Sequence, residues 1–263
     1  MSLSKAAQTN GHLWGARSRI WADVQEGQFA PAYHAVLAHA GVGPGTRHLD
    51  AGCGAGMAAA LSASLGAKVA GLDAAEGMLA IARERTPLGD FRLGDIEALP
   101  FEDDSFDLVT GFNAFQFAGD PAQALREAGR VTRPGGMIVI MTWGDPAGME
   151  AASLVAAMKP LLPSPPPGAP GPFALSDETA LHQFAANGGL RSVEVRDVDT
   201  PWYYRDAKTA LAGLGSSGVA VKAIEHSGED AFIEATLEAL APFRQSNGSY
   251  RIGARARFLV AAP

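Results

Sequence analysis

The stretch HLDAGCGAGM, residues 48–57, decides the fold, because a short apolar run leads there into three alternating glycines and then into a helical pattern. Glycine lets the backbone turn sharply and approach a ligand with no Cβ in the way. The start of the following helix presents free N–H groups. Loops of this kind bind nucleoside ligands at the carboxyl ends of parallel strands. We therefore expect a strand, loop and helix unit with a ligand at the loop.

The sequence around this stretch alternates apolar runs with helical patterns through the first 145 residues, which is typical of a parallel sheet with helices on both faces. An acidic N-cap before a proline marks one helix start at Asp120-Pro121. Three helical stretches are expected within 206–243, and one at 176–187. The last two strands are expected to join the same sheet. The predicted strands lie at 47–50, 68–73, 90–95, 106–113, 136–143, 190–199 and 249–261.

Composition limits the class of protein. The 263 residues are 47% apolar, enough for a sizeable core, and no run of about 18 apolar residues occurs. The first 30 residues lack a contiguous apolar segment, so we expect a cytoplasmic protein without membrane insertion. With 28 acidic against 21 basic residues, a nucleic-acid partner is disfavoured. The single cysteine, Cys53, excludes an internal disulfide, and the spacing of the six histidines suggests no metal.

Two segments allow more than one interpretation. Residues 159–173 hold seven of the 17 prolines and predict an extended connector, either a surface loop or part of a lid. In the final strand Arg251, Arg255 and Arg257 share one face by the two-residue period, as a phosphate site would require. Pairing with acids of the preceding strand is the favoured interpretation, the candidates being Glu194, Asp197 and Asp199.

The glycine spacing argues against a dinucleotide. The dinucleotide fingerprint is G-x-G-x-x-G, whereas the loop here is G-x-G-x-G, with Met57 where that pattern has Gly or Ala. Glycines also serve tight packing of a strand against a helix, so the loop alone does not prove a ligand. Three acidic residues at the ends of predicted strands favour a bound ligand. Asp73 is placed to accept ribose hydroxyls, Asp95 to read an adenine amino group, and Asp50 to attract ammonium or sulfonium charge and repel a pyrophosphate.

At this point the sequence resembles the class I S-adenosylmethionine (SAM) dependent methyltransferases, in particular the small-molecule branch with the ubiquinone and menaquinone methyltransferases and the methyltransferase type 11 domain. Five ordered motifs carry the resemblance across roughly residues 46–143. They read LDAGCGAG, GLDAAEGML, GDIEALPF, FDLVTGFNAFQF and RVTRPGGMIVI. The resemblance implies a Rossmann-like, doubly wound seven-stranded α/β sheet whose last strand is antiparallel.

The resemblance also implies which residues hold SAM, with S-adenosylhomocysteine (SAH) as the product. The loop and Asp50 would contact the methionine part, Asp73 the ribose, and Asp95 the adenine. Asn113 would face the sulfonium region. The full set of expected cofactor contacts is Asp50, Ala51, Gly52, Cys53, Gly54, Gly56, Asp73, Ala74, Met78, Asp95, Ile96 and Asn113.

The chain departs from some relatives after the fourth strand. Phe115-Gln116-Phe117 stands where family members often carry histidine, and Asn113-Ala114-Phe115-Gln116 is not the (Asp/Asn)-Pro-Pro-Tyr motif of enzymes that methylate amino groups of nucleic acids. Methyl transfer from a sulfonium needs no dedicated catalytic residue, so none is named. Acceptor contacts are expected from covering elements, although ordinary packing explains the aromatic residues at least as well. The candidates are Trp14, Arg17, Trp21, Gln116, Trp202 and Tyr203.

The expected organisation is an N-terminal helical cover at 1–45 and a methyltransferase domain at 46–263. Within the domain, 159–173 is the connector and 204–246 a helical insertion that completes a lid with the N-terminus. The leading hypothesis is methyl transfer from SAM to a small-molecule acceptor. Two alternatives stay open, a SAM-binding protein without turnover and, with less support, a nicotinamide-dependent oxidoreductase.

Overall fold

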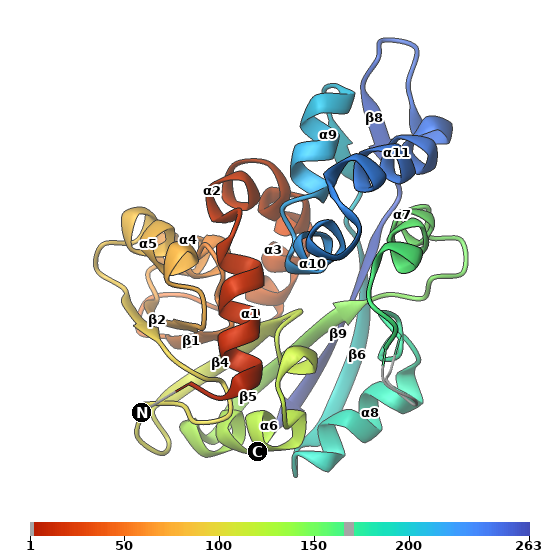
Figure 1. Cartoon of the computed structure of the whole chain (residues 1–263). Coiled ribbons are helices and arrows are strands. Elements are labelled where there is room, and N and C mark those ends of the chain that lie inside the picture. Colours follow the sequence, from red (N-terminus) through yellow and green to blue (C-terminus); the bar gives the residue numbers. More distant parts are fainter. Residues whose placement is uncertain (1–2, 166–170) are drawn as a thin grey trace.

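A central sheet of seven strands organises the computed structural model, which describes residues 3–165 and 171–263 (Figure 1). The strand order is β3-β2-β1-β4-β5-β9-β6, and β9 runs antiparallel to both neighbours. This confirms the predicted sheet with its antiparallel last strand. The strands of the sheet are β1 (Arg47–Ala51), β2 (Lys68–Asp73), β3 (Asp90–Leu93), β4 (Phe106–Phe112), β5 (Thr132–Trp143), β6 (Arg191–Asp199) and β9 (Arg255–Ala262).

Helices cover both faces of the sheet because the strands bury both sets of alternating side chains. In β5, Val139 and Met141 pack toward a core shared with α3, whereas Ile138 and Ile140 pack with α6 and α8 on the other face. The carboxylate of Asp120 caps α6 as predicted. The helices against the sheet are α3 (Ala30–His39), α4 (Met57–Ser64), α5 (Glu76–Arg85), α6 (Pro121–Val131) and α8 (Glu178–Asn187).

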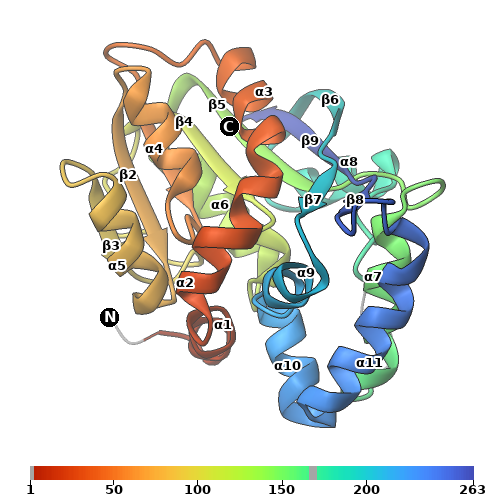
Figure 2. The same cartoon turned by 90° about the horizontal axis from the view of Figure 1, so that it is seen from above.

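A second group of elements lies over the carboxyl ends of the strands. Figures 1 and 2 show α1 beside α10, and α11 beside α7, as their packing contacts require. The N-terminal part of this cover is α1 (Lys5–Gly15), α2 (Ser18–Ile20), the π-helical turn η1 (Trp21–Gln25) and the 3₁₀ turn η2 (Glu26–Phe29). The remainder is η3 (Phe115–Phe117), α7 (Ala151–Met158), η4 (Lys159–Leu161), β7 (Trp202–Tyr204), α9 (Ala207–Leu214), α10 (Gly218–Ser227), α11 (Glu229–Leu240), η5 (Ala241–Phe243) and β8 (Tyr250–Ile252).

The predicted last strand at 249–261 is wrong as a single strand. β8 pairs with β7 outside the main sheet, and only β9 joins β5 and β6. The break lies at Gly253, whose carbonyl accepts the N–H of Ala151 (3.0 Å), and at Ala254, whose carbonyl accepts the N–H of Thr200 (2.8 Å). These tertiary bonds replace the ladder for two residues and redirect the chain. The other strand boundaries differ from the prediction by a few residues, most at β5, where Arg133 to Gly136 form an irregularity within the strand.

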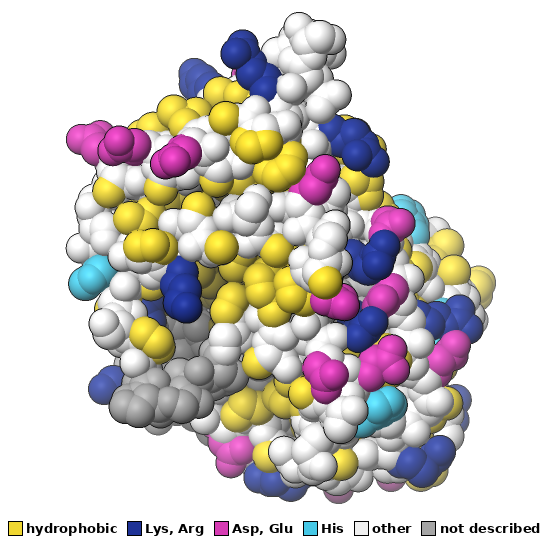
Figure 3. Space-filling view, turned by 90° about the vertical axis from the view of Figure 1, so that its right-hand side faces the viewer, with side chains coloured by type: hydrophobic (Ala, Val, Ile, Leu, Met, Phe, Trp, Pro, Cys, Tyr) yellow, Lys and Arg dark blue, Asp and Glu magenta, His cyan; other side chains and the backbone are white. Residues whose placement is uncertain are grey.

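Two of the three arginines predicted to share one face of the last strand form ion pairs with acids of β6. Arg257 binds Asp197 through two nitrogens (2.6 and 2.8 Å), and Arg255 binds Asp199 (2.9 Å), as the favoured interpretation required. Arg251 belongs to β8 instead, with its guanidinium over the ring of Tyr203. Glu194 pairs with Arg196 of its own strand. On the face shown in Figure 3 many Lys and Arg side chains lie next to Asp or Glu.

The proline-rich connector is only partly described. Its first residues form η4. Residues 166–170 lie outside the described part of the chain, so the prediction of an extended connector is not tested there. No helix within residues 3–165 and 171–263 is both long and apolar enough to cross a membrane.

Candidate active site

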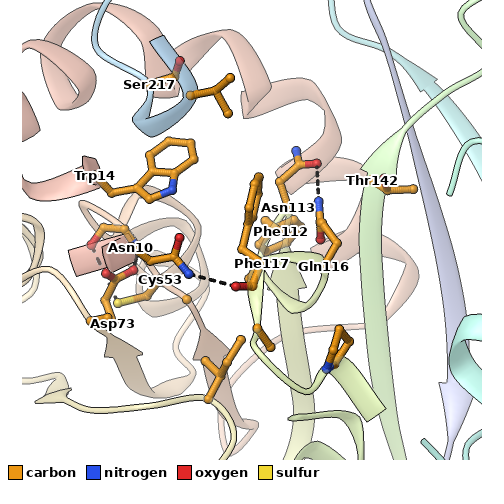
Figure 4. Close-up of a pocket in the computed structure, with 18 of the residues that line it drawn as sticks. Asn10, Trp14, Cys53, Asp73, Phe112, Asn113, Gln116, Phe117, Thr142 and Ser217 are labelled. Carbon is orange, nitrogen blue, oxygen red and sulfur yellow. Dashed lines mark hydrogen bonds between the residues drawn. The ribbon is translucent and has the colours of Figure 1, made fainter. Parts of the chain in front are cut away.

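One large cavity, about 840 Å³ in volume, opens at the carboxyl ends of the strands under the covering helices. In Figure 4 Asn113 and Gln116 stand between Asp73 and Cys53 on one side and Thr142 on the other. We call the side at the glycine loop and at the ends of β1, β2 and β3 the acidic half. We call the side at the end of β5 and under β7 the apolar half; its walls include Phe29, Tyr33, Thr142, Trp143 and Trp202.

The glycine loop follows β1 in a conformation that only glycine adopts without strain. Gly52, Gly54 and Gly56 all have positive φ, at 73°, 52° and 78°. A Cβ on Gly52 would lie 2.5 Å from Ala114, and one on Gly56 would lie 2.7 Å from Ala82. A Cβ on Gly54 would meet nothing closer than 3.9 Å. Gly54 therefore leaves an open cradle toward the cavity, while the other two glycines are needed for packing.

Asp73 ends β2 and closes the floor of the acidic half. Its carboxylate accepts the N–H groups of Gly54 and Ala75, each at 2.8 Å. Burial raises the pKa of Asp73, and these backbone hydrogen bonds oppose the shift. A carboxylate has about four lone-pair positions, so each oxygen can accept a further hydrogen bond from a ligand hydroxyl.

Asp95 lies just beyond β3 at the same edge of the sheet. Its carboxylate accepts the N–H of Glu97 (3.0 Å) and the N–H of Ser4 (3.2 Å), the N-cap residue of α1. Asp95 and Ile96 both line the cavity. The N-cap residue of α1 therefore contacts the carboxylate that is predicted from the sequence to bind the adenine amino group.

Asp50 sits at the end of β1 in a buried polar chain. The hydroxyl of Thr110 donates to Asp50 Oδ1 (2.8 Å), and His48 Nε2 lies 2.8 Å from the same hydroxyl. Burial raises the pKa of Asp50 to about 7, with the charges of Glu26 and Asp73 acting in the same direction. Burial lowers the pKa of His48 to about 3, so its imidazole is neutral. A neutral His48 that donates from Nε2 to Thr110 fixes the direction of the chain toward Asp50.

Glu26 is a site residue that the sequence analysis missed. This η2 residue is 3% exposed, accepts the N–H of Met57 at the start of α4 (3.2 Å) and pairs with Arg85. Burial raises the pKa of Glu26 despite that pair. Its carboxylate occupies the helix N-terminus where a dinucleotide pyrophosphate would bind, which weighs against a nicotinamide cofactor. No local motif marks it, because the contact joins residues 31 positions apart.

The predicted cofactor residues gather in one place. Ten of them line the cavity, and Ala51 and Gly56 lie behind the lining as part of the loop. The ten are Asp50, Gly52, Cys53, Gly54, Asp73, Ala74, Met78, Asp95, Ile96 and Asn113.

The candidate acceptor residues divide into two groups. Trp14, Trp21, Gln116 and Trp202 line the cavity. Arg17 and Tyr203 are not among the lining residues: Arg17 donates to Glu229 (2.9 Å), and Tyr203 is exposed on the small β7–β8 sheet.

The apolar half contains an aromatic cluster built from distant parts of the chain. The ring of Phe29 lies 5.7 Å from Trp143 and 6.2 Å from Trp202, and the two indoles are 5.8 Å apart. Tyr33 packs edge-on against Phe112 at 4.7 Å. Burial raises the pKa of Tyr33 well above its ordinary value, so its phenol stays neutral. This half offers aromatic surface and few polar groups.

Comparisons with known proteins agree with this geometry. Residues 49–140 match the family model described as a methyltransferase domain. A demethylmenaquinone methyltransferase of Renibacterium salmoninarum is 42% identical over 106 residues, which cover 40% of this chain and 45% of that protein. A malonyl-[acyl-carrier protein] O-methyltransferase of Serratia marcescens is 42% identical over 99 residues, covering 38% of this chain and 39% of that protein.

These alignments span less than half the length of either relative. The family match at 49–140 includes the glycine loop and the strand-end acids Asp50, Asp73 and Asp95. The solved structure of the YcgJ protein from Bacillus subtilis shares the fold, with a TM-score of 0.57 at 21% identity over 88% of this chain and 98% of that chain. The family match, the sheet order and the position of the cavity agree with one another. Residues 49–140 are similar to the methyltransferase domain family, and the named relatives are methyltransferases.

Proposed function

We propose that this protein transfers a methyl group from SAM to a small-molecule acceptor by in-line displacement. The observation that carries the proposal is that the acids after β1, β2 and β3 and the open cradle at Gly54 all line one cavity. The named relatives act on different molecules, by their names demethylmenaquinone and malonyl-[acyl-carrier protein], and the family match covers only residues 49–140 of this chain. That part therefore supports the cofactor assignment and leaves the acceptor to the rest of the cavity.

The acidic half fits SAM by shape and by charge. A Cβ placed on Gly54 would lie 3.9 Å from Trp21 Nε1 and 4.0 Å from Glu26 Oε1, so a donor and an acceptor flank the cradle. Trp21 would donate to the methionine carboxylate, and Glu26 and Asp50 would attract the ammonium and sulfonium charges. Asp73 would hold the ribose and Asp95 the adenine. Each assignment uses groups that already face the same space.

When bound, SAM supplies a methyl group activated by a positively charged sulfur, and its transfer to a nucleophile releases SAH. The residues of this chain then have three tasks. The acids and the loop fix the position of the methyl group. Asn113 and Gln116 line the boundary between the two halves, where the cofactor would meet the acceptor. The covering helices exclude water, which strengthens the electrostatic interactions inside.

The test is a calorimetric titration of the purified protein with SAH, with NAD as the parallel control. Micromolar binding of SAH without binding of NAD is expected, because Glu26 and Asp50 disfavour a pyrophosphate. Binding of NAD in place of SAH would overturn the proposal. SAH binding together with no methylated product across a broad panel of acceptors would favour a SAM-binding protein without turnover.

A further inference from the structure

The charged side chains that line the described part of the cavity are all acidic. They are Glu26, Asp50, Asp73, Asp95, Glu97 and Asp120, and no Lys, Arg or His of residues 3–165 or 171–263 lines it. The nearby Arg85 is engaged by Glu26 and by the carbonyls of Ala22 and Ala55. An anionic molecule in this cavity would meet negative charge and no cationic partner.

The apolar half adds a second constraint. Of the five residues named as its walls, only Tyr33 has an ionisable side chain, and its phenol is neutral. The rings of Phe29, Trp143 and Trp202 form an aromatic surface, with ring centroids 5.7–6.2 Å apart. Burying a charge in such surroundings is strongly unfavourable unless a partner pairs with it. Flat apolar rings, in contrast, pack favourably against aromatic walls.

Two polar atoms at the border of this half have no hydrogen-bond partner among residues 3–165 and 171–263. Gln116 donates its amide to Asn113 Oδ1 (3.2 Å), while its own carbonyl oxygen is buried and unpaired. The indole nitrogen of Trp202, which is 3% exposed, is also unpaired. Leaving buried polar groups unpaired is unfavourable, so a ligand hydroxyl or amine group that donates to the Gln116 oxygen or accepts from the Trp202 N–H relieves part of that cost. Neither atom would hold a carboxylate by charge.

From these observations we infer that the apolar half takes an aromatic acceptor that carries no negative charge and that is held by ring packing on Trp143 and Trp202 and by a hydrogen bond to Gln116. The inference rests on the proposed function for the role of this molecule as methyl acceptor. It excludes anionic acceptors such as free carboxylates and phosphorylated or carrier-bound acids.

The test compares three ligands with one scaffold: 2-naphthalenemethanol (neutral), 2-naphthylmethylamine (cationic) and 2-naphthoate (anionic). Binding to the full chain is measured with saturating SAH by the fluorescence change of the lining tryptophans and by calorimetry. The neutral or the cationic ligand is expected to bind at least about tenfold more tightly than 2-naphthoate. Equal or tighter binding of 2-naphthoate, or binding of none of the three, would overturn the inference.

A charge variant sharpens the test. Gln116→Lys places an ammonium group at the border of the apolar half, so 2-naphthoate should gain at least about tenfold while the amine loses affinity. Gln245→Lys is the matched control, because Gln245 is exposed in the loop between η5 and β8 and its side chain binds no residue of the described lining. If Gln116→Lys fails to fold, the three wild-type affinities still decide. Failure of SAH to bind would overturn the proposed function, whereas tight binding of 2-naphthoate beside intact SAH binding would overturn only this inference.

Discussion

The two halves of the cavity are built in different ways. Most of the acidic half comes from one contiguous part of the chain, where each strand ends in a loop that faces the same edge of the sheet, and Trp21 and Glu26 of the N-terminal cover complete it. The apolar half is assembled from η2, the end of β5 and β7, whose aromatic residues Phe29, Trp143 and Trp202 are far apart in sequence. The difference indicates that the proposed SAM residues are placed mostly by local geometry, whereas the proposed acceptor residues are brought together by tertiary packing.

The largest expected effect concerns the glycines of the acidic half. Gly56→Ala should destabilise the protein by about 2–5 kcal/mol, because the methyl group is added at a φ of 78° and would lie 2.7 Å from Ala82. Thermal and denaturant unfolding measure this loss. SAH binding should fall with it, since Gly56 anchors the loop to α5.

Gly54→Ala is the matched comparison for Gly56→Ala. Its φ of 52° gives a similar backbone strain of about 1–2 kcal/mol, but the added methyl group meets no atom closer than 3.9 Å. It would project into the cradle, so SAH affinity should fall at least about tenfold with only a small loss of stability. Equal unfolding losses in the two variants would show that the loop is not divided into packing and ligand positions.

The next effect separates the two halves directly. Asp73→Ala and Asp95→Ala should each weaken SAH binding by about 1–3 kcal/mol, or roughly 5- to 150-fold, because each removes hydrogen bonds to a buried ligand group. Thr142→Val in the apolar half keeps the side-chain shape and should leave SAH affinity within about twofold. Calorimetry on the three variants suffices. Unchanged SAH affinity in both Asp variants would refute the cofactor assignment.

A smaller effect depends on pH and tests the charge of the acidic half. The pKa of Asp50 is about 7 in the folded protein and about 4 in an unfolded chain, so folding stabilises the protonated form. This contribution to stability is present at low pH and is lost as pH rises from about 4 through about 7. A cationic ligand prefers the ionised form, so SAM should bind about fivefold to tenfold more tightly at about pH 7.5 than at about pH 6.

Asp50→Asn provides the control for that pH dependence. The amide keeps a hydrogen-bonding oxygen near Thr110 but cannot ionise, so the slope of SAM affinity with pH should become smaller. Glu26 and Asp73 also have raised pKa values and face the same space, so part of the slope should persist. An unchanged slope in the variant would assign the pH dependence to Glu26 and Asp73 alone.

The contrast between the halves also explains how far the sequence could predict this molecule. The seven-stranded sheet with its antiparallel last strand and the placement of Asp50, Asp73 and Asp95 at strand ends could be predicted, because in these motifs chemistry and secondary structure occupy the same few residues. Glu26 was missed because its role depends on a contact with the start of α4, and nothing in its own neighbourhood marks that contact. Arg17 was predicted as an acceptor contact, but in the fold it donates to Glu229, a residue far away in sequence, and does not line the cavity.

The same limit applies to the end of the chain. Alternation of apolar and polar residues continues through Gly253, so the sequence predicts one strand where the structure has β8 and β9. The break is decided by backbone bonds to Ala151 and Thr200, which belong to other parts of the chain. Periodicity reports which face a residue occupies, and it does not report which strand lies opposite.

The smallest expected effect concerns two arginines of β9 that differ in burial. Arg255 makes one exposed contact with Asp199, so Arg255→Ala should cost less than about 0.5 kcal/mol. Arg257, whose side chain is 11% exposed, binds Asp197 through two nitrogens and donates to the carbonyl of Ser176 (2.6 Å). Its loss should cost about 1 kcal/mol, because it leaves the Ser176 carbonyl without this partner.

The two arginine variants also report on the apolar half. Ser176 donates its hydroxyl to the carbonyl of Phe173 (2.8 Å), and the ring of Phe173 lies 6.3 Å from that of Trp143 in the apolar half. Arg257→Ala should therefore loosen this wall and weaken 2-naphthalenemethanol binding a few-fold. SAH affinity should be unchanged, because the acidic half shares no contact with this arginine. Arg255→Ala should change neither affinity. Arg257→Ala could instead weaken SAH binding and leave binding of the naphthyl ligand unchanged. That result would show that the two halves are coupled through the sheet, and it would contradict their division into a locally built half and a half built by tertiary packing.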